Sequence, residues 1–581
     1  MHTICLKNPV PFSLLKVKPK KWIYVGTNYQ HTLQIAKQLH PYNIEQFTIN
    51  KLFYEISQIH KIKVNNFLAS LSKKYVHLTH WTTELSNRNA KTCQLMNELF
   101  LLLTIDSLIK SADEPLLIII ESAEIFKIIE KKCNSSMQFF DVEVNNKINE
   151  TSYLTALYER TKYVVQQLQK KEKVNRLLPQ TPITLIGIWF NDGALHDENP
   201  FETYCGMLEE YLSLEDSPIF YMGYTENCAG HKLLKENLAH HFSNILFPED
   251  WQTFKDILSA ALLPLLHITR YKNIQFDEYD ITSLLNKQQK QEFSNPGNSS
   301  YLSLYYFFKN LKKRNVKIER FIYPFENHPW EKVCIRALRT FFPQTKIIGF
   351  QHTPAPQFML GYTPTSDELL NMPYPDTIVT CGKNSYNALK KGWEPTVKVL
   401  EGCTLRYAPL SSEKQNFCHH SANTCGVLFS KNNSTNRELF DVILESSQQL
   451  PNHNFLIMLH PSKDNDAIIE DFIALKHENI SFFTGSIDDF LNYISILIIS
   501  CSDFCIKAML KEIPTICFCG MGKLDMNPQE DPSIEQRFFD SPSLCSKIIS
   551  FNEQKSDIST FSLKKFFNPL EDKYLKNFTL Y

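Results

Sequence analysis

Short apolar runs alternate with amphipathic stretches along most of the chain. The clearest alternation lies in the last third, where stretches of helical periodicity separate five apolar runs: 426–430, 454–459, 480–484, 495–501 and 514–519. Runs of this length, buried on both faces, are typical of strands in a parallel sheet. The pattern predicts an α/β fold in which residues 424–550 form a doubly wound parallel sheet. Ligands bind such sheets beyond the carboxyl ends of the strands.

The same alternation continues upstream in a less regular form. Apolar runs at 22–27 and 115–121 predict an N-terminal α/β region over residues 1–175. Another apolar run, 183–190, begins a further α/β domain over 180–407. Alternating strands and helices at this spacing favour parallel sheets covered by helices.

Four other stretches are expected to join or cover the predicted sheets. The polar stretch 408–424 predicts an interdomain linker, and the C-terminal segment 551–581 is expected to pack back on the 180–407 domain. Residues 151–178 are charged and helical, which predicts a solvated helix or a connector. The helix predicted over 251–268 is amphipathic and fits either the core or a membrane surface, where the basic stretch 309–317 would lie nearby.

Composition narrows the class of protein. The 581 residues carry 61 Lys+Arg and 62 Asp+Glu, so the basic excess of a general nucleic-acid binder is missing. The 15 cysteines include no C-x-x-C pair, which indicates reduced thiols in the cytoplasm. No apolar run approaches the ~20 residues of a membrane span, and lysines interrupt the N-terminus where a signal peptide needs an apolar core. We expect a cytoplasmic protein that works on the inner side of any membrane it meets.

The 16 glycines exclude several enzyme classes. The only G-x-G pair is Gly520 and Gly522, and the third glycine of a dinucleotide-binding motif is absent because position 525 is Asp. The chain contains neither a P-loop nor the G-x-S-x-G motif of α/β-hydrolases. These absences argue against a dehydrogenase, a P-loop NTPase and an α/β-hydrolase.

Two strand ends in the last third carry residues suited to an anion. His460 follows the strand at 454–459, and Ser462 and Lys463 stand where the next helix begins. Ser500 and Ser502 end the strand at 495–501. Free N–H groups and the dipole at a helix N-terminus attract phosphate. Helix capping by the serines and a structural role for the histidine are the alternatives.

The 180–407 domain offers candidates for a general base. Glu326 follows a predicted strand and is the first choice, and Glu331 is the second. Capping of the next helix is an equally good explanation for Glu326. His352 ends a further strand of this domain, where it could touch a bound substrate. Arg406, just before the linker, could bind a phosphate bidentately or form a surface salt bridge.

Two possible metal motifs carry less weight. Cys418, His419, His420 and Cys425 have suitable ligand atoms, but their spacing fits no usual zinc site. Asp464-x-Asp466 resembles the D-x-D motif of metal-dependent transferases, yet acidic residues are expected at a helix start. We expect a metal-independent mechanism and no cofactor.

The segment 480–518 resembles the donor-binding half of GT-B glycosyltransferases. The His-Pro pair with the downstream Ser-x-Ser is similar to bacterial sialyl-, polysialyl- and Kdo-type transferases, which use CMP-activated sugars. That resemblance implies that His460, Ser500 and Ser502 hold the donor phosphate. It also implies a GT-B-like fold, with two facing Rossmann-like domains beside the N-terminal α/β region.

Upstream segments resemble proteins of O-antigen or capsule-type surface-carbohydrate biosynthesis. The segments that carry this resemblance are 80–92, 321–339, 347–356, 375–393 and 401–407. It implies transfer of a sugar from a nucleotide sugar, with a CMP-sugar favoured, to a surface polysaccharide, lipopolysaccharide or lipid-linked glycan. Peripheral contact with the inner membrane would accompany a lipid-linked acceptor.

One departure from the GT-B pattern keeps other functions open. Many GT-B enzymes bind the ribose with an acidic residue where this chain has Lys507, and lysine cannot accept a hydrogen bond. A nucleotide-sugar 2-epimerase and a catalytically inactive GT-B-like scaffold are the two alternatives.

Overall fold

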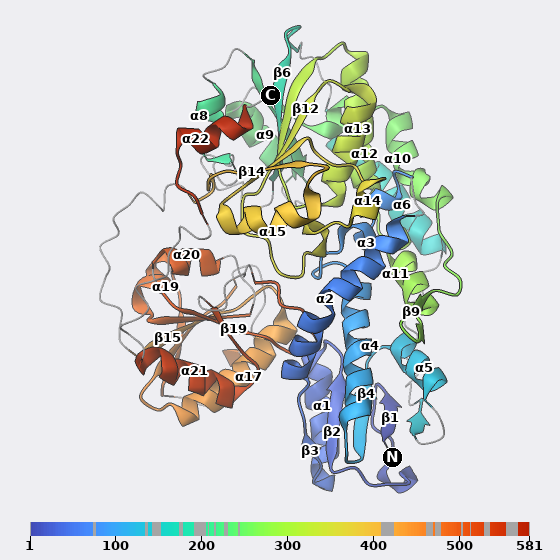
Figure 1. Cartoon of the computed structure of the whole chain (residues 1–581), viewed down its shortest axis with the longest axis vertical. Coiled ribbons are helices and arrows are strands. Elements are labelled where there is room, and N and C mark those ends of the chain that lie inside the picture. The colour runs from blue at the N-terminus through green and yellow to red at the C-terminus, as the bar shows by residue number, and fades with distance from the viewer. Residues whose placement is uncertain are drawn as a thin grey trace.

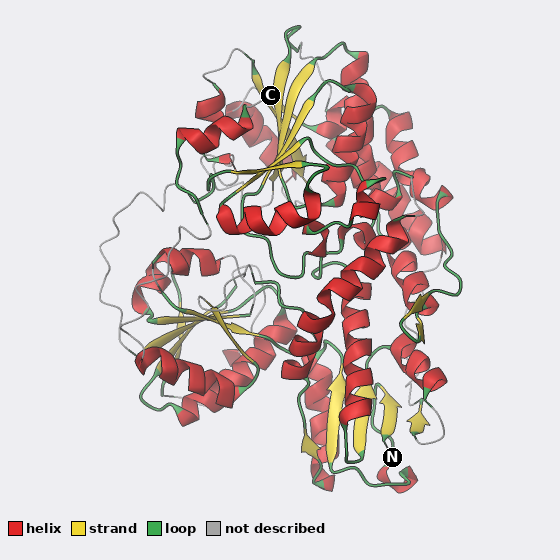
Figure 2. Ribbon diagram, viewed as in Figure 1, coloured by secondary structure: helices red, strands yellow, loops and turns green. Residues whose placement is uncertain are grey.

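The computed structural model contains three parallel sheets, each covered by helices (Figures 1 and 2). The described residues are 2–73, 77–133, 137–141, 153–172, 178–190, 205–206, 208–213, 217–225, 231–241, 244–407, 423–460, 469–470, 478–500, 504–511, 513–527, 535–553 and 567–579. Among them, no helix combines the length and hydropathy that crossing a bilayer requires.

The N-terminal sheet has five strands in the order β3-β2-β4-β1-β5. Its centre is β4 (Leu116–Ile120), whose five residues are all buried, as its continuous apolar run predicts. The other strands are β1 (Thr3–Leu6), β2 (Lys21–Val25), β3 (Glu45–Gln46) and β5 (Gln138–Phe140). The helices of this region are α1 (Tyr29–Leu39), α2 (Asn50–Ser72), α4 (Gln94–Ser111) and α5 (Ala123–Lys132).

The middle sheet has seven strands in the order β14-β13-β12-β11-β6-β7-β8. The strands are β6 (Ile183–Phe190), β7 (Ile219–Thr225), β8 (Ile245–Leu246), β11 (Ile318–Pro324), β12 (Lys346–Phe350), β13 (Thr377–Thr380) and β14 (Lys398–Glu401). The central strand β11 leads into α13 (Pro329–Phe341), which starts with a proline at its first position. The helices α12 (Gly297–Lys313) and α15 (Lys383–Trp393) belong to the same domain.

The C-terminal sheet has six strands in the order β17-β16-β15-β18-β19-β20. The five predicted strands are confirmed as β15 (Thr424–Leu428), β16 (Asn454–Met458), β17 (Ile480–Phe483), β18 (Ile496–Ile499) and β19 (Thr515–Phe518). The edge strand β20 (Glu535–Phe538) was missed because its sequence, EQRF, has no apolar run. Its helices are α17 (Asn433–Gln449), α19 (Ile487–Tyr493), α20 (Phe504–Leu510) and α21 (Ser541–Glu553).

The C-terminal segment returns to the middle sheet. The Asn568 N–H donates to the carbonyl of Cys381, and Thr404 N–H donates to the carbonyl of Asn568. Beyond α22 (Asp572–Leu575), Phe578 is buried with its ring 6.0 Å from that of Phe350. Two parallel α/β domains joined by a C-terminal crossover have the arrangement of a GT-B fold, and the five-stranded domain is an addition to it.

The segment predicted as a solvated helix or a connector is a helix with one face exposed and the other packed on neighbouring helices. α6 (Tyr153–Lys170) packs against α10 (Phe254–Leu266) and α11 (Thr282–Ser294). The reason is Arg160, which is 1% exposed and donates to the carbonyl of Ala261 and to the hydroxyl of Ser299. α6 therefore packs with the helices beside the seven-stranded sheet, although its sequence lies in the N-terminal region.

Candidate active-site cleft

A cleft of about 1540 Å³ opens at the carboxyl ends of the C-terminal sheet. Its opposite wall comes from the carboxyl ends of β2 and β4 in the five-stranded domain. Lys287 on α11, and Arg406 and Tyr407 after β14, also line the cleft. Pockets for small ligands usually measure ~300–1000 Å³. The cleft is therefore large enough for two substrates at once.

The C-terminal wall contains two of the residues predicted from the sequence. His460 follows β16, Ser500 follows β18, and both line the cleft. Only β15 separates the two strands, so their ends are about 10 Å apart. Ser500 is 9% exposed, and its hydroxyl has no hydrogen-bond partner among the described residues. A buried hydroxyl without a partner is a candidate for a ligand contact.

The other predicted anion ligands divide into two groups. Arg406 lies on the cleft, with its guanidinium 5.4 Å from the centre of the Tyr407 ring. Ser462, Lys463 and Ser502 lie outside the described residues, so their roles stay predictions.

Three lysines, of which only Lys507 stood out in the sequence, make this wall cationic. Lys431, Lys507 and Lys523 line the cleft together with Arg406. Lys523 Nζ donates to Asn432 Oδ1 at 2.9 Å, and burial lowers the pKa of Lys523 to about 8. Lys507 Nζ lies 3.3 Å from Asp488 Oδ2. These cations can neutralise a bound phosphate.

The opposite wall presents carboxylates and neutral polar groups. Glu121 Oε2 accepts a hydrogen bond of 2.6 Å from the Thr27 N–H, and both residues line the cleft. Glu98, which also lines it, pairs with Lys287 at 2.8 Å. The sequence did contain a signal for this wall, because Thr27 and Glu121 end the predicted strands at 22–27 and 115–121.

Direct contacts hold the two walls together. Asn97 Nδ2 donates to the carbonyl of Gly522 at 2.6 Å, and Tyr29 donates its hydroxyl proton to Asp441 Oδ2 at 3.0 Å. Gly522 has a φ of +59°, and a Cβ there would lie 2.3 Å from the carbonyl oxygen of Gly26. Only glycine permits this approach, which sets the width of the cleft at one end.

Glu326 belongs to a separate carboxylate–histidine cluster. Its Oε2 lies 2.5 Å from His328 Nε2, and its Oε1 lies 3.6 Å from His352 Nε2. Burial raises the pKa of Glu326, but the charges of His328 and His352 outweigh burial and hold it at about 2. Neither Glu326 nor His352 lines the large cleft. The positive charge of Lys91, which does line it, acts on the Glu326 carboxylate.

Glu331, the second candidate base, caps the start of α13. Its carboxylate accepts hydrogen bonds from the N–H groups of Glu326, Asn327 and His328. Its side chain is therefore occupied by the backbone, and burial raises the pKa of Glu331 to about 8. Capping explains Glu331, whereas the carboxylate of Glu326 faces two imidazoles.

The segment 80–92 lies between the cleft and this cluster. Lys332 Nζ donates to the carbonyl of Ser86 at 2.7 Å, and Arg88 Nη1 lies 2.7 Å from Glu368 Oε1. The side chains of Arg88 and Glu368 are both 0% exposed. The segment ends in Ala90, Lys91 and Thr92, which line the cleft. Buried polar bonds thus position one edge of the site.

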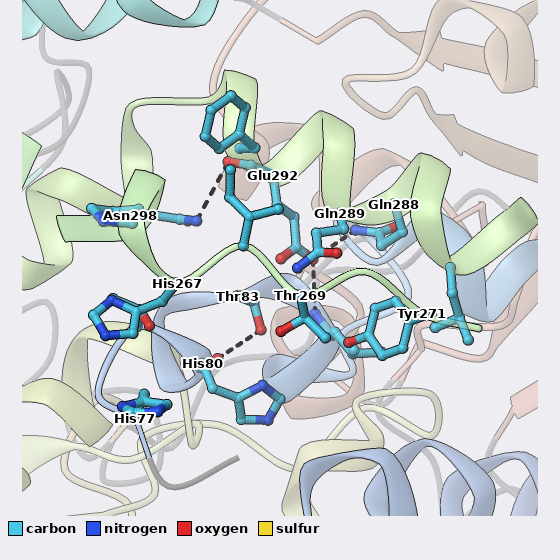
Figure 3. Close-up of a pocket in the computed structure, with 16 residues that line it drawn as sticks. His77, His80, Thr83, His267, Thr269, Tyr271, Gln288, Gln289, Glu292 and Asn298 are labelled. Carbon is cyan, nitrogen blue, oxygen red and sulfur yellow. Dashed lines mark hydrogen bonds between the residues drawn. The ribbon is translucent and has the colours of Figure 1, made fainter. Parts of the chain in front are cut away.

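A smaller pocket lies on another side of this segment (Figure 3). It is lined by His77, His80 and His267, and by the buried carboxylate of Glu292. The rings of His77 and His267 are 4.7 Å apart, and burial lowers the pKa of His80 to about 3. Within the described ranges, no group of three or more His, Cys, Asp or Glu residues is placed to hold a metal ion.

The residues weighed for metal binding are mostly outside the described chain. This applies to Cys418, His419, His420, Asp464 and Asp466. Cys425, the remaining cysteine of that set, is buried in β15. The metal-independent mechanism stays a prediction.

Glu292 makes protein stability depend on pH. Burial raises its pKa to about 7, while Gln288 Nε2 and the Leu85 N–H donate to its Oε1. The folded state therefore binds the proton more tightly, and its contribution is full below the unfolded pKa and lost as pH rises to about 7. We expect Glu292→Gln, which keeps the accepting oxygen, to remove roughly 3 kcal/mol of this pH dependence between pH 4.5 and 8. Urea unfolding at several pH values measures it, and an unchanged difference between wild type and variant across that range would contradict it.

The sequence matches no family model and no curated protein. Among solved structures, the chain is similar to a putative UDP-N-acetylglucosamine 2-epimerase from Listeria monocytogenes, with 11% identity, a TM-score of 0.40 and coverage of 68% of this chain and 94% of that one. The lipopolysaccharide outer core galactosyltransferase WaaB is 10% identical with a TM-score of 0.37, and the match covers 69% of this chain and 98% of that one. HepE from Anabaena in complex with UDP is 10% identical with a TM-score of 0.37, and the match covers 66% of this chain and 92% of that one. These identities and TM-scores transfer no substrate to this chain.

Proposed function

We propose that this protein is a glycosyltransferase that uses a nucleotide sugar. The observation that carries the proposal is the C-terminal wall of the cleft, where an unpartnered buried hydroxyl, an imidazole and several cations meet at the carboxyl ends of parallel strands. Nucleotide phosphates bind at this edge of doubly wound sheets. The wall offers both the charge and the hydrogen-bond donors that a departing nucleotide needs.

The donor phosphates would lie between Ser500, His460 and Lys523. The Ser500 hydroxyl can donate to a phosphate oxygen without giving up a hydrogen bond to any residue that the structure describes. The imidazole of His460 can hydrogen-bond or protonate the phosphate as it leaves. A CMP-sugar is the favoured donor because of the sequence resemblance around His460. A screen with CMP, UDP and GDP distinguishes between the possible nucleobases.

The acceptor would lie against the five-stranded domain. The polar side chains there, including Thr27, Asn97, Glu98 and Glu121, can exchange hydrogen bonds with the hydroxyls of a glycan. The volume of the cleft supports a second substrate beside the donor. The acceptor was expected on the 180–407 domain, and the lining residues favour the N-terminal domain instead. A surface polysaccharide or lipid-linked glycan follows from the sequence resemblance.

The base would come from the carboxylate–histidine cluster. Glu326 is ionised beside His328 and His352, outside the cleft lining, and its carboxylate is also influenced by the positive charge of Lys91, which lines the edge of the cleft. Glycosyl transfer needs a group that accepts the proton of the attacking hydroxyl. His352, oriented by the carboxylate of Glu326, or Glu326 itself can accept it.

A thermal-shift screen with CMP, UDP and GDP tests the donor site. A nucleotide that binds the folded state raises the melting temperature, and we expect at least one of the three to raise it by about 2 °C or more at saturation. Ser500→Ala should weaken the binding of that nucleotide about tenfold, because a hydrogen bond to a charged group is lost. Lys523→Met should weaken it by a similar or larger factor.

Two matched variants serve as controls for this screen. Ser550→Ala and Lys511→Met change the same residue types in the C-terminal domain away from the cleft, and both should bind like wild type. Equal binding by the cleft and control variants would contradict the donor site. No shift with any nucleotide would favour an inactive scaffold, and release of an altered nucleotide sugar without acceptor would identify an epimerase.

A further inference from the structure

One face of α10 exposes a row of large apolar side chains. Phe254, Leu258, Leu262 and Leu266 follow one another at intervals of four residues, and they are 55%, 38%, 40% and 77% exposed. Ile268, just beyond the helix, is 42% exposed. Single exposed leucines are ordinary, but a continuous apolar row on the surface marks a site of interaction.

The neighbouring helix α6 carries a second row. Leu154, Tyr158, Val165 and Leu168 are 75%, 65%, 47% and 40% exposed and lie on one face of the helix. The opposite face is buried through Arg160 and Tyr163. The apolar row is therefore not the core-facing side of α6.

Both rows lie on the same side of the helix pair. The helices run antiparallel: Lys171 Nζ reaches the carbonyl of Gln252, the buried Tyr163 packs with Ile257, and Arg160 bonds to the carbonyl of Ala261. Successive residues of a helix are turned by ~100° about its axis. On both helices, a turn in the same direction about the axis, viewed from the N- to the C-terminus, leads from the contact positions to the apolar row. In an antiparallel pair this arrangement puts the two rows side by side on one surface, at the edge of the molecule where Figure 1 shows α6 and α10.

Exposed cations lie on these two helices and at one end of a neighbouring helix. Lys162 on α6 and Lys255 on α10 are exposed, as are Lys312, Lys313 and Arg314 at the end of α12, which packs beside α10. The carboxylate of Asp256 on α10 does not offset them at the surface. It is buried and accepts hydrogen bonds from Thr253 and Asn310.

We propose that the α6–α10 surface docks on an anionic lipid bilayer. An apolar face bordered by lysine and arginine lies in a membrane interface with its apolar side chains among the acyl chains and its cations at the lipid phosphates. A second copy of this chain fits less well, because a two-fold contact through this surface would bring identical cations together. Docking does not depend on the proposed reaction.

Co-sedimentation of the full chain with vesicles tests the proposal. We expect binding to vesicles that contain phosphatidylglycerol, and weaker binding to phosphatidylcholine alone or at high salt. Leu154→Ser with Leu266→Ser should weaken binding about tenfold or more, because two side chains lose their apolar insertion. These residues are 75% and 77% exposed, so the fold should not change.

The matched control is Ile59→Ser with Ile62→Ser on α2, where the isoleucines are 71% and 74% exposed but lie outside the α6–α10 surface. This variant should bind vesicles like wild type. Equal loss in both double variants, or no vesicle binding by wild type, would overturn the proposal. A dimer that Leu154→Ser with Leu266→Ser dissociates, seen by analytical ultracentrifugation, would assign the surface to a second copy. The nucleotide thermal shift of each variant reports separately on the donor site.

Discussion

Arg88→Met is expected to lower the free energy of unfolding by about 3–5 kcal/mol. The Arg88–Glu368 pair is fully buried, and removing the guanidinium leaves the Glu368 carboxylate without its partner. Denaturant unfolding measures the loss. The double variant Arg88→Met with Glu368→Leu should recover most of it, because a buried ion pair can often be replaced by apolar side chains of similar size.

A neighbouring ion pair offers the control for this experiment. Lys73 and Asp367 lie 2.6 Å apart, but their side chains are 49% and 55% exposed. Lys73→Met should therefore cost less than about 1 kcal/mol. A similar cost for Arg88→Met and Lys73→Met would show that burial of the Arg88–Glu368 pair does not anchor the 80–92 segment.

Glu326→Gln is expected to reduce sugar transfer at least ~100-fold while leaving nucleotide binding unchanged. The amide cannot accept the acceptor proton, and it removes the negative charge that His328 and His352 face. The donor wall is formed by other residues, so the thermal shift with the nucleotide should equal that of wild type. Release of nucleotide from the donor sugar, in the presence of the acceptor, measures turnover.

Glu331→Ala separates this effect from a structural one. It removes the cap on three backbone N–H groups and should lower the melting temperature. Glu326→Gln with near wild-type turnover would exclude both Glu326 as the base and a role for it in orienting His352.

Strand ends show how far the sequence could lead to the site. His460 and Ser500 stand at the ends of two apolar runs that form strands of one parallel sheet on either side of β15, and the rule for strand ends predicts that both lie at the ligand-binding edge. The same rule, applied to 22–27 and 115–121, would have selected Thr27 and Glu121. Those residues were missed because local patterns do not tell which of three sheets faces another.

Side-chain contacts distinguish the two candidate bases and refine one helix assignment. Glu326 and Glu331 are five residues apart in a polar turn, and only their contacts distinguish a carboxylate facing imidazoles from one capping backbone N–H groups. For α6, charge and helical periodicity predicted a solvated helix or a connector. Instead, the buried Arg160 bonds one side of α6 to the neighbouring helices, which leaves an apolar row on the outside.

By itself, the sequence determined the α/β class, the strands of the C-terminal sheet and the polar residues at their ends, because these depend on apolar runs and turns within short segments. Only the tertiary structure decided that the five-stranded domain closes the cleft and that α6 and α10 share an exposed surface. It also decided that Lys523 and Glu121 lie on opposite walls of the cleft. These features depend on contacts between residues hundreds of positions apart, such as Asn97 with Gly522, which no local pattern encodes.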